Sequence, residues 1–115
     1  MEDLDTPYFR FYKRHIQYFL DKDIDGLVAN DYTEDAQVIA GEFHAQGTEA
    51  LRQLFTGYLD MIGDFTLRST DKFHESEDTI ILEATMDTEK TGERKVYDCF
   101  VMRDGKIAYH FTGVR

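Results

Sequence analysis

The residues of this chain whose types suit acid–base chemistry include an aspartate and a histidine near its C-terminal end. Asp98 and His110 lie on either side of the dipeptide Asp104-Gly105, which separates two runs rich in β-forming residues. Asp-Gly between such runs is a strong signal for a β-hairpin. A carboxylate that faces an imidazole across a hairpin can fix the tautomer of the ring and shift the pKa of both groups.

The length of the turn decides whether these two side chains share a face of the hairpin. If Gly105 is the left-handed third residue of a three-residue loop, Asp98 lies opposite His110. A two-residue loop would place Asp98 opposite Phe111 and turn His110 to the other face, because successive side chains of a strand alternate. The three-residue loop is the prediction on which the acid–base hypothesis rests.

A third candidate, His15, lies in the first predicted helix. Thr6 is expected to cap this helix, with Pro7 at its first position. An apolar stripe at helical spacing then runs through Tyr8, Phe11, Tyr12, His15 and Phe19. His15 is therefore either a core histidine with satisfied ring nitrogens or a pocket group that exchanges a proton or donates a hydrogen bond.

The elements that must position these residues are two further helices and a run of strands. Asp23 is expected to cap a short second helix that ends at 32–35, and the third helix runs from Gly47-Thr48 to a stop at Gly63. Strands are predicted over 35–40, 42–45, 65–73, 79–88, 94–103 and 106–114. Helices first and meandering strands last indicate one α+β domain over residues 1–115 with an antiparallel sheet, without linker or internal repeat.

The composition indicates a folded, acidic protein. Its 115 residues are 42% apolar and 14% aromatic, which suffices for one core, and the nine Phe and seven Tyr favour either an aromatic-lined cavity or an apolar interface. The net charge is −10, and the only basic cluster is Arg10, Lys13 and Arg14. Nucleic acid and anionic membrane are therefore not expected as main partners, since both need clustered basic side chains.

The single cysteine, the N-terminus and the strand pattern support three further expectations. Cys99 has no partner for an internal disulfide, and alternation predicts a small buried residue that faces away from Asp98. Residues 1–5 are acidic and lack an apolar run, so neither a signal peptide nor a membrane span is expected and a cytoplasmic location is the default. Apolar residues on both faces, as in Ile80-Ile81-Leu82, predict that the outer face of the sheet packs on a second copy in a homodimer.

Three local patterns carry a family resemblance. They are Asp23-Ile24-Asp25-Gly26-Leu27-Val28 leading to Tyr32-Thr33-Glu34-Asp35-Ala36, then Gly47-Thr48-Glu49-Ala50-Leu51 before an aromatic-rich helix end, then the hairpin at 100–107. With the order of elements, they resemble the nuclear transport factor two-like superfamily, in its SnoaL-like and ketosteroid-isomerase-like branch. The resemblance implies a cone-like curved sheet wrapped around a long N-terminal helix, with an internal pocket. Members include isomerases, polyketide cyclases, epoxide hydrolases, dehydratases and catalytically silent binding or association domains, so the fold places a site without naming its chemistry.

The resemblance to the isomerases retains one of their three catalytic residue types. Their first-helix Tyr falls at His15, their general-base Asp at Ala40, and their protonated oxyanion-donating Asp at Asp98. Ala40 cannot accept a proton, so the isomerase mechanism is not expected as it stands. His110 falls where those enzymes have an apolar residue that lines the pocket.

The catalytic candidates are therefore Asp98, His110 and His15. In this hypothesis Asp98 orients, His110 acts as base or acid, and His15 or Tyr12 polarises a substrate oxygen. The expected pocket lining is Tyr12, Phe19, Ala40, Tyr58, Phe100 and Thr112. A purely structural Asp–His pair would satisfy the same two side chains without chemistry.

Other chemistries find less support in the sequence. Two imidazoles and a carboxylate form an acceptable metal-ligand set, but no local spacing motif for a metal is present, so none is expected. No Gly-rich phosphate loop or nucleophile elbow appears, so no cofactor is expected either. His44 is expected to be solvated, in a short strand or loop near the pocket mouth, and Asp35 is expected to bond turn amides.

The expected function is that of a small protein with an apolar pocket for an oxygen-bearing molecule. As an enzyme it would be a cofactor-free isomerase, cyclase or dehydratase that uses general acid–base catalysis. The alternative is a non-catalytic ligand-binding or association domain that acts as a homodimer. A third class, a protein-interaction module, would lack a cavity of the ~300 Å³ typical of ligand sites.

Overall fold

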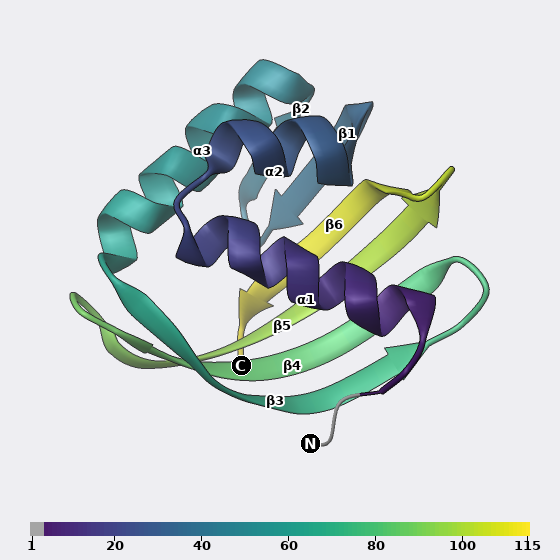
Figure 1. Ribbon diagram of the computed structural model, residues 1–115. Coiled ribbons are helices and arrows are strands. Elements are labelled where there is room, and N and C mark those ends of the chain that lie inside the picture. The colour runs from purple at the N-terminus through teal and green to yellow at the C-terminus, as the bar shows by residue number, and fades with distance from the viewer. Residues whose placement is uncertain (1–3) are drawn as a thin grey trace.

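Three helices lie on the concave side of one curved six-stranded sheet (Figure 1). The computed structural model describes residues 4–115; the expectation about the N-terminus rests partly on residues 1–3, which lie outside the described residues. The elements follow the order α1 (Pro7–Leu20), α2 (Ile24–Asp31), β1 (Tyr32–Ala40), β2 (Phe43–Gln46), α3 (Thr48–Ile62), β3 (Phe65–Glu75), β4 (Thr79–Thr88), β5 (Gly92–Arg103) and β6 (Lys106–Val114). The α+β fold with a sheet that curves around α1 is thus confirmed.

The sheet has the strand order β2-β1-β6-β5-β4-β3. Neighbouring strands run antiparallel, with one exception: β1 pairs with β6 in parallel. The prediction of a wholly antiparallel sheet is wrong at this pair. A parallel pair requires a long crossover connection, and here everything from β2 to β5 separates the two strands in the sequence. This crossover places the first strand directly beside the last one.

The β5–β6 turn has two residues, not the predicted three. Arg103 pairs with Lys106, and both turn residues have positive φ, 54° at Asp104 and 79° at Gly105. Such a pair of left-handed residues matches the right-handed twist of the flanking strands, which is why Asp-Gly favours the two-residue hairpin loop.

A β-bulge then restores the face that the two-residue turn would have lost. Ala108 is an extra residue of β6, and beyond it Phe100 pairs with His110 and Asp98 pairs with Thr112. The prediction that Asp98 lies directly opposite His110 is therefore wrong. The two side chains nevertheless share the inner face as diagonal neighbours, a distance that long side chains can bridge.

The first two helices begin where the sequence predicts. The Thr6 hydroxyl accepts a hydrogen bond from the backbone N–H of Phe9 (3.1 Å), and Pro7 occupies the first helical position. Asp23 caps α2 in the same way through the N–H of Gly26 (2.9 Å). Each cap satisfies a helix N–H that has no partner within the helix.

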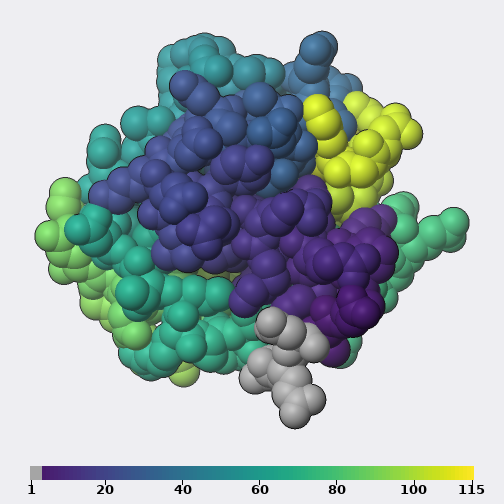
Figure 2. All heavy atoms as spheres, viewed as in Figure 1, coloured from purple at the N-terminus to yellow at the C-terminus, as the bar shows by residue number. Residues whose placement is uncertain are grey.

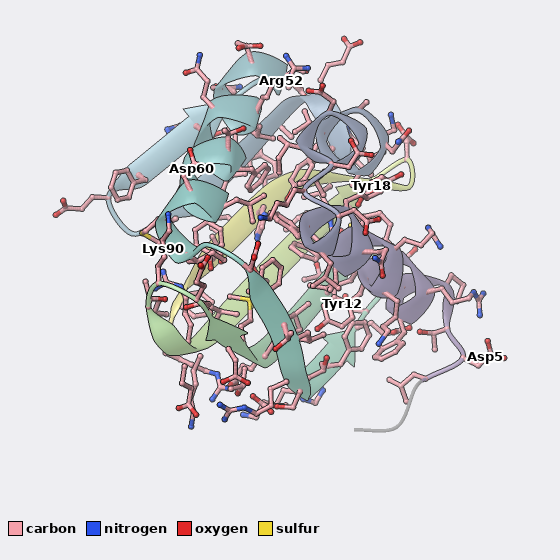
Figure 3. All side chains as sticks on the ribbon, turned by 60° about the vertical axis from the view of Figure 1, so that its left-hand side comes forward. Asp5, Tyr12, Tyr18, Arg52, Asp60 and Lys90 are labelled. Carbon is pink, nitrogen blue, oxygen red and sulfur yellow. The ribbon has the colours of Figure 1, made fainter. Side chains whose placement is uncertain are left out.

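The end of α3 is fixed against the β4–β5 turn. Gly63 ends the helix with φ at 73°, and a Cβ at this position would collide with the Glu89 carboxylate. Lys90 donates from Nζ to the carbonyl oxygen of Asp60 (3.0 Å), and both residues are labelled at this end of α3 in Figure 3. These contacts hold α3 over one side of the sheet.

The core fills the space between the helices and the inner face of the sheet. Fully buried side chains come from every layer, among them Tyr12 in α1, Leu27 in α2, Leu51 in α3 and Leu82 in β4. In the space-filling view, α1 and α2 cover the side that faces the reader, and the region of the β5–β6 turn lies beside them (Figure 2). No helix in residues 4–115 is long and apolar enough to cross a membrane.

Candidate functional site

A cavity of about 730 Å³ lies between α1, α3 and the concave face of the sheet. Its volume lies in the range of small-molecule sites, well above the ~300 Å³ at which such sites begin. Nine residues named from the sequence contribute to its wall, namely Tyr12, His15, Phe19, Ala40, Tyr58, Asp98, Phe100, His110 and Thr112. Most other lining residues are apolar, so the few polar atoms on the wall dictate what the cavity can bind.

His110 is held at both ring nitrogens. The Tyr32 hydroxyl lies 2.9 Å from Nδ1, and Oδ1 of Asp98 lies 2.7 Å from Nε2. Burial raises the pKa of Tyr32 well above its usual value, aided by the charges of Asp98 and Asp31, so this phenol keeps its proton. The tautomer that satisfies every atom has the Tyr32 O–H donating to Nδ1 and the Nε2–H donating to Asp98.

His110 lacks the free ring nitrogen that the predicted role as base or acid requires. The Asp98–His110 contact exists, but neither nitrogen of His110 is free to exchange a proton with a ligand. Asp98 has its second oxygen without a hydrogen-bond partner among the described residues, and its side chain is 19% exposed against 5% for His110. Within this pair, the group with spare bonding capacity is therefore the carboxylate of Asp98.

His15 forms a second pair, with an aspartate that the sequence analysis did not single out. Its Nδ1 lies 2.9 Å from Oδ2 of Asp31, and the side chains are 3% and 6% exposed. Burial lowers the pKa of His15, the hydrogen bond to Asp31 and its charge oppose this, and the neighbouring His110 lowers the pKa further. His15 is thus neutral near pH 7, with Nδ1–H donating to Asp31 and a lone pair on Nε2.

The Nε2 atom of His15 is the unoccupied base of the site. It has no hydrogen-bond partner among residues 4–115, and His15 contributes to the cavity wall. A carboxylate behind one ring nitrogen and a free lone pair on the other is the arrangement in which an imidazole works as a general base.

The two imidazoles are close neighbours in an aromatic setting. Their ring centroids lie 6.4 Å apart, and the Phe100 ring contacts both, at 5.1 Å from His15 and 4.6 Å from His110. Phe19 packs edge-on against His15 at 5.4 Å. His15 and His110 are only 3% and 4% exposed among these rings, and a low-dielectric setting of this kind strengthens their hydrogen bonds.

The two tyrosines that were predicted to line the cavity, Tyr12 and Tyr58, both form hydrogen bonds through their hydroxyl groups. The Tyr12 hydroxyl lies 2.7 Å from Oγ1 of Thr70, and burial raises the pKa of Tyr12 to about 12. Figure 3 labels Tyr12 on α1, which crosses the concave side of the sheet. The Tyr58 hydroxyl accepts a hydrogen bond from Nε of Arg94 (3.2 Å).

Asp31 and Tyr32 are the site residues that sequence reasoning missed. Asp31 follows Ile24, Leu27 and Val28 at the spacing of one helical face, and all four are buried. An acid that continues an apolar stripe was the available signal for Asp31. Tyr32 was assigned to the end of α2, whereas it is the first residue of β1, and no sequence pattern marks its contact with His110.

Two other residues considered from the sequence lie outside the cavity wall. His44 is exposed and its Nε2 contacts Oε1 of Gln37 (2.7 Å). Asp35 is exposed and forms an ion pair with Arg103 (2.6 Å). Within residues 4–115, no three His, Cys, Asp or Glu side chains are grouped so that they could hold a metal ion.

Solved structures with this fold include three that cover nearly the whole chain. A protein of Sinorhizobium meliloti, provisionally named a polyketide cyclase, is 17% identical with a TM-score of 0.81 over 97% of this chain and 99% of its own. TerC, co-crystallised with polyporic acid, is 17% identical with a TM-score of 0.79 over 96% and 92% of the two chains. An NTF2-like protein of Anabaena variabilis is 19% identical with a TM-score of 0.77 over 100% and 94%.

Comparison with sequences gives the family directly. No curated protein matches the chain. The model of the SnoaL-like domain matches residues 12–110, which include most of α1, all six strands in whole or in part, and both members of each His–Asp pair described above. The chain therefore belongs to the SnoaL-like domain family, within the NTF2-like fold.

Proposed function

We propose that this protein binds an apolar, oxygen-bearing small molecule in the cavity and acts on it as a cofactor-free acid–base catalyst of the cyclase, isomerase or dehydratase type. The observation that carries the proposal is the free Nε2 of His15, backed by Asp31 and placed on an apolar wall. A neutral imidazole in this position can accept a proton from a carbon next to a carbonyl group or from a hydroxyl group. General acid–base catalysis of this kind typically contributes about 10²–10⁴ in rate.

An intramolecular aldol closure shows how the proton would travel. Nε2 of His15 takes the proton from the carbon beside one carbonyl, and that carbon then bonds to the second carbonyl carbon of the same molecule. The C=O bond that is attacked becomes an alkoxide, which takes the proton back from the imidazolium. The product has the same atoms as the substrate, so the step needs neither an oxidant nor a second reactant.

Asp98 acts in this proposal as the group that orients the substrate. Its Oδ1 is fixed by the Nε2–H of His110, and Tyr32 in turn fixes His110, so the free oxygen points from a rigid support. That oxygen would accept a hydrogen bond from a substrate hydroxyl group. Orientation by such supported groups is a large part of what an active site contributes to rate.

The relatives support an organic ring system as the ligand class. TerC was crystallised with polyporic acid, and another structure with this fold is provisionally named a polyketide cyclase. The link between these two proteins and this chain is the shared fold. The aromatic wall around His15 and Phe100 suits a ligand with planar rings.

A carbon-acid exchange assay tests the proposed base without knowledge of the natural substrate. The bicyclic ketone 2-tetralone is incubated with the protein in D₂O, and loss of the proton signal next to the carbonyl is followed by NMR. We expect exchange to be faster than in buffer, and about 10²-fold or more slower in His15→Asn, which keeps a donor for Asp31 but removes Nε2. His44→Asn is the control and should match the wild type.

Two outcomes would refute the base assignment. One is exchange no faster than in buffer although NMR line broadening shows that the ketone binds. The other is full exchange activity in His15→Asn.

A homodimer through the outer face of the sheet is proposed as well, and it also suits the alternative of a non-catalytic ligand-binding or association domain. Ile39, Phe111, Cys99 and Ile81 stand in register across β1, β6, β5 and β4. Ile81 is 50% exposed and Phe111 38%, so this row presents apolar surface to the outside. Cys99 is partly exposed here, not buried as predicted.

Sedimentation equilibrium tests the dimer. Wild type is expected to sediment as a dimer and Ile81→Lys as a monomer, because a charge in the middle of the row would have to be desolvated. Leu20→Lys, at the end of α1, is the matched control and should remain dimeric. A wild type that sediments as a monomer at high concentration contradicts this proposal and leaves the cavity chemistry untouched.

A further inference from the structure

Arg94 is a cation on the cavity wall that the acid–base chemistry does not use. It lies on β5 with Val96, Asp98 and Phe100 at alternate positions, and all four line the cavity. Its cross-strand partner is the buried Met86. Among the described residues that line the cavity, Arg94 is the only Lys or Arg, and Asp98 the only Asp or Glu.

The contacts of Arg94 leave most of its hydrogen-bond donors unused. Its Nε donates to the Tyr58 hydroxyl (3.2 Å), and the guanidinium carbon lies 5.5 Å from the centre of the Tyr58 ring. The two terminal nitrogens have no hydrogen-bond partner in residues 4–115, and no carboxylate pairs with Arg94 there. Tyr58 therefore holds the guanidinium in place without neutralising it.

The absence of an ion pair is notable because acids are abundant in this chain. Aspartate and glutamate number 23 against 13 lysines and arginines. Five other arginines pair with carboxylates, namely Arg10, Arg52, Arg68, Arg103 and Arg115; Arg14, on the exposed side of α1, lies over the Phe11 ring and, like Arg94, has no carboxylate partner in residues 4–115. An arginine that is fixed by a tyrosine, kept from carboxylates and turned to a cavity is suited to an anion from outside.

We propose that Arg94 binds an acidic oxygen group of the ligand, a carboxylate or an enolate, at one end of the cavity. This inference rests on the proposed function and narrows its ligand class to elongated apolar acids. The flat fork of N–H donors matches a carboxylate in two parallel hydrogen bonds. Arg94 and Asp98 are four residues apart on one strand, about 13 Å between their Cα atoms at the usual rise. A ligand with its anion on Arg94 therefore carries its apolar body toward His15 and Asp98.

The positions of Arg94 and Asp98 favour one orientation of an acidic ligand in the cavity. Arg94 is the cation on the cavity wall and Asp98 the acid, so an anionic group is favoured beside Arg94 and disfavoured beside Asp98. An acid can thus enter with its charged end in one position, and the carbon to be deprotonated is directed toward the neutral His15.

Calorimetric titration with a matched pair of probes tests the inference. The probes are 2-naphthoate and its neutral isostere 2-naphthamide, and the proteins are wild type, Arg94→Gln, Arg94→Lys and the control Arg103→Gln, whose arginine lies on the surface in a pair with Asp35. Thermal melting verifies that each variant is folded. We expect wild type to bind the naphthoate about ten- to a hundredfold more tightly than the amide, the range for a hydrogen-bonded charge.

The variants separate this inference from the proposed function. Arg94→Gln should lose the preference for naphthoate and keep its affinity for the amide, Arg94→Lys should retain part of the preference, and Arg103→Gln should behave as wild type. Three outcomes overturn the role of Arg94: equal affinity of the wild type for both probes, a preference for naphthoate that survives in Arg94→Gln, or one that disappears in Arg103→Gln. Each of these outcomes still leaves the cavity as a ligand site. Failure of both probes to bind overturns the inference together with the proposed apolar ligand.

Discussion

The structure predicts opposite tautomers for two histidines whose rings nearly touch. His15 should carry its proton on Nδ1, where Asp31 accepts it, and His110 on Nε2, where Asp98 accepts it. Nitrogen NMR of a protein labelled at histidine distinguishes the protonated from the bare ring nitrogen directly. The perturbation that probes the first pair is Asp31→Asn, which keeps the shape of the side chain and removes its charge.

The size of the effect follows from the burial of the pair. Both side chains of the His15–Asp31 pair are almost completely buried, and the amide introduced by Asp31→Asn replaces the charged acceptor with a neutral one. A hydrogen bond to a charged group is worth about 1 kcal/mol more than a neutral one. For a chain of 115 residues, that loss lowers the melting temperature by about 4 °C. Because Asp31 raises the pKa of His15 against the effect of burial, the variant should also titrate at lower pH than the wild type.

Asp35→Asn serves as the control, since this acid is exposed and pairs with Arg103. It should leave the nitrogen signals of His15 unchanged. A wild-type His15 that carries its proton on Nε2, or a pKa of His15 that stays the same or rises in Asp31→Asn, would contradict the assignment of His15 as the base.

Three further predictions concern stability. Folding lowers the pKa of His15, so below about pH 6.5 the unfolded chain binds a proton that the folded chain does not. The unfolding free energy should therefore fall on acidification through this range and stay level above it. Urea unfolding at pH 8, 6 and 5 should show a smaller fall in unfolding free energy for His15→Asn than for the wild type. Tyr32→Phe leaves Nδ1 of His110 buried without a donor and should cost about 1–3 kcal/mol in the same assay. Gly63→Ala forces a side chain into a left-handed residue against Glu89, and calorimetry should show a lower melting temperature, whereas Gly57→Ala, in an open helical position, should not.

Local sequence signals predicted the elements of the fold well. The caps at Thr6 and Asp23 and the stop at Gly63 each depend on residues within a few positions of each other. Such short-range chemistry can be read from the sequence. The parallel pairing of β1 with β6 depends on residues far apart, and no local pattern encodes it.

Asp98 and His110 do share the inner face of the sheet, as predicted, but not for the predicted reason. Asp98 and His110 were placed together by a three-residue turn that does not exist, and a bulge at Ala108 gives them the same face instead. The sequence marks a bulge weakly, because its extra residue needs no special side chain. Phe9 illustrates a related limit: it lies off the predicted apolar stripe of α1, yet it is buried against Phe73 with ring centroids 4.9 Å apart.

Asp31 and Tyr32 are consecutive residues, one ending α2 and the other opening β1, and each holds a different imidazole. The peptide unit between Asp31 and Tyr32 therefore supports the hydrogen-bond partners of both histidines. Moving it by about half an ångström would loosen both hydrogen bonds at once, since such contacts tolerate little more than that. We therefore expect a ligand that displaces one imidazole to disturb the other through this shared stretch of backbone, so that the junction between helix and strand couples the two histidines.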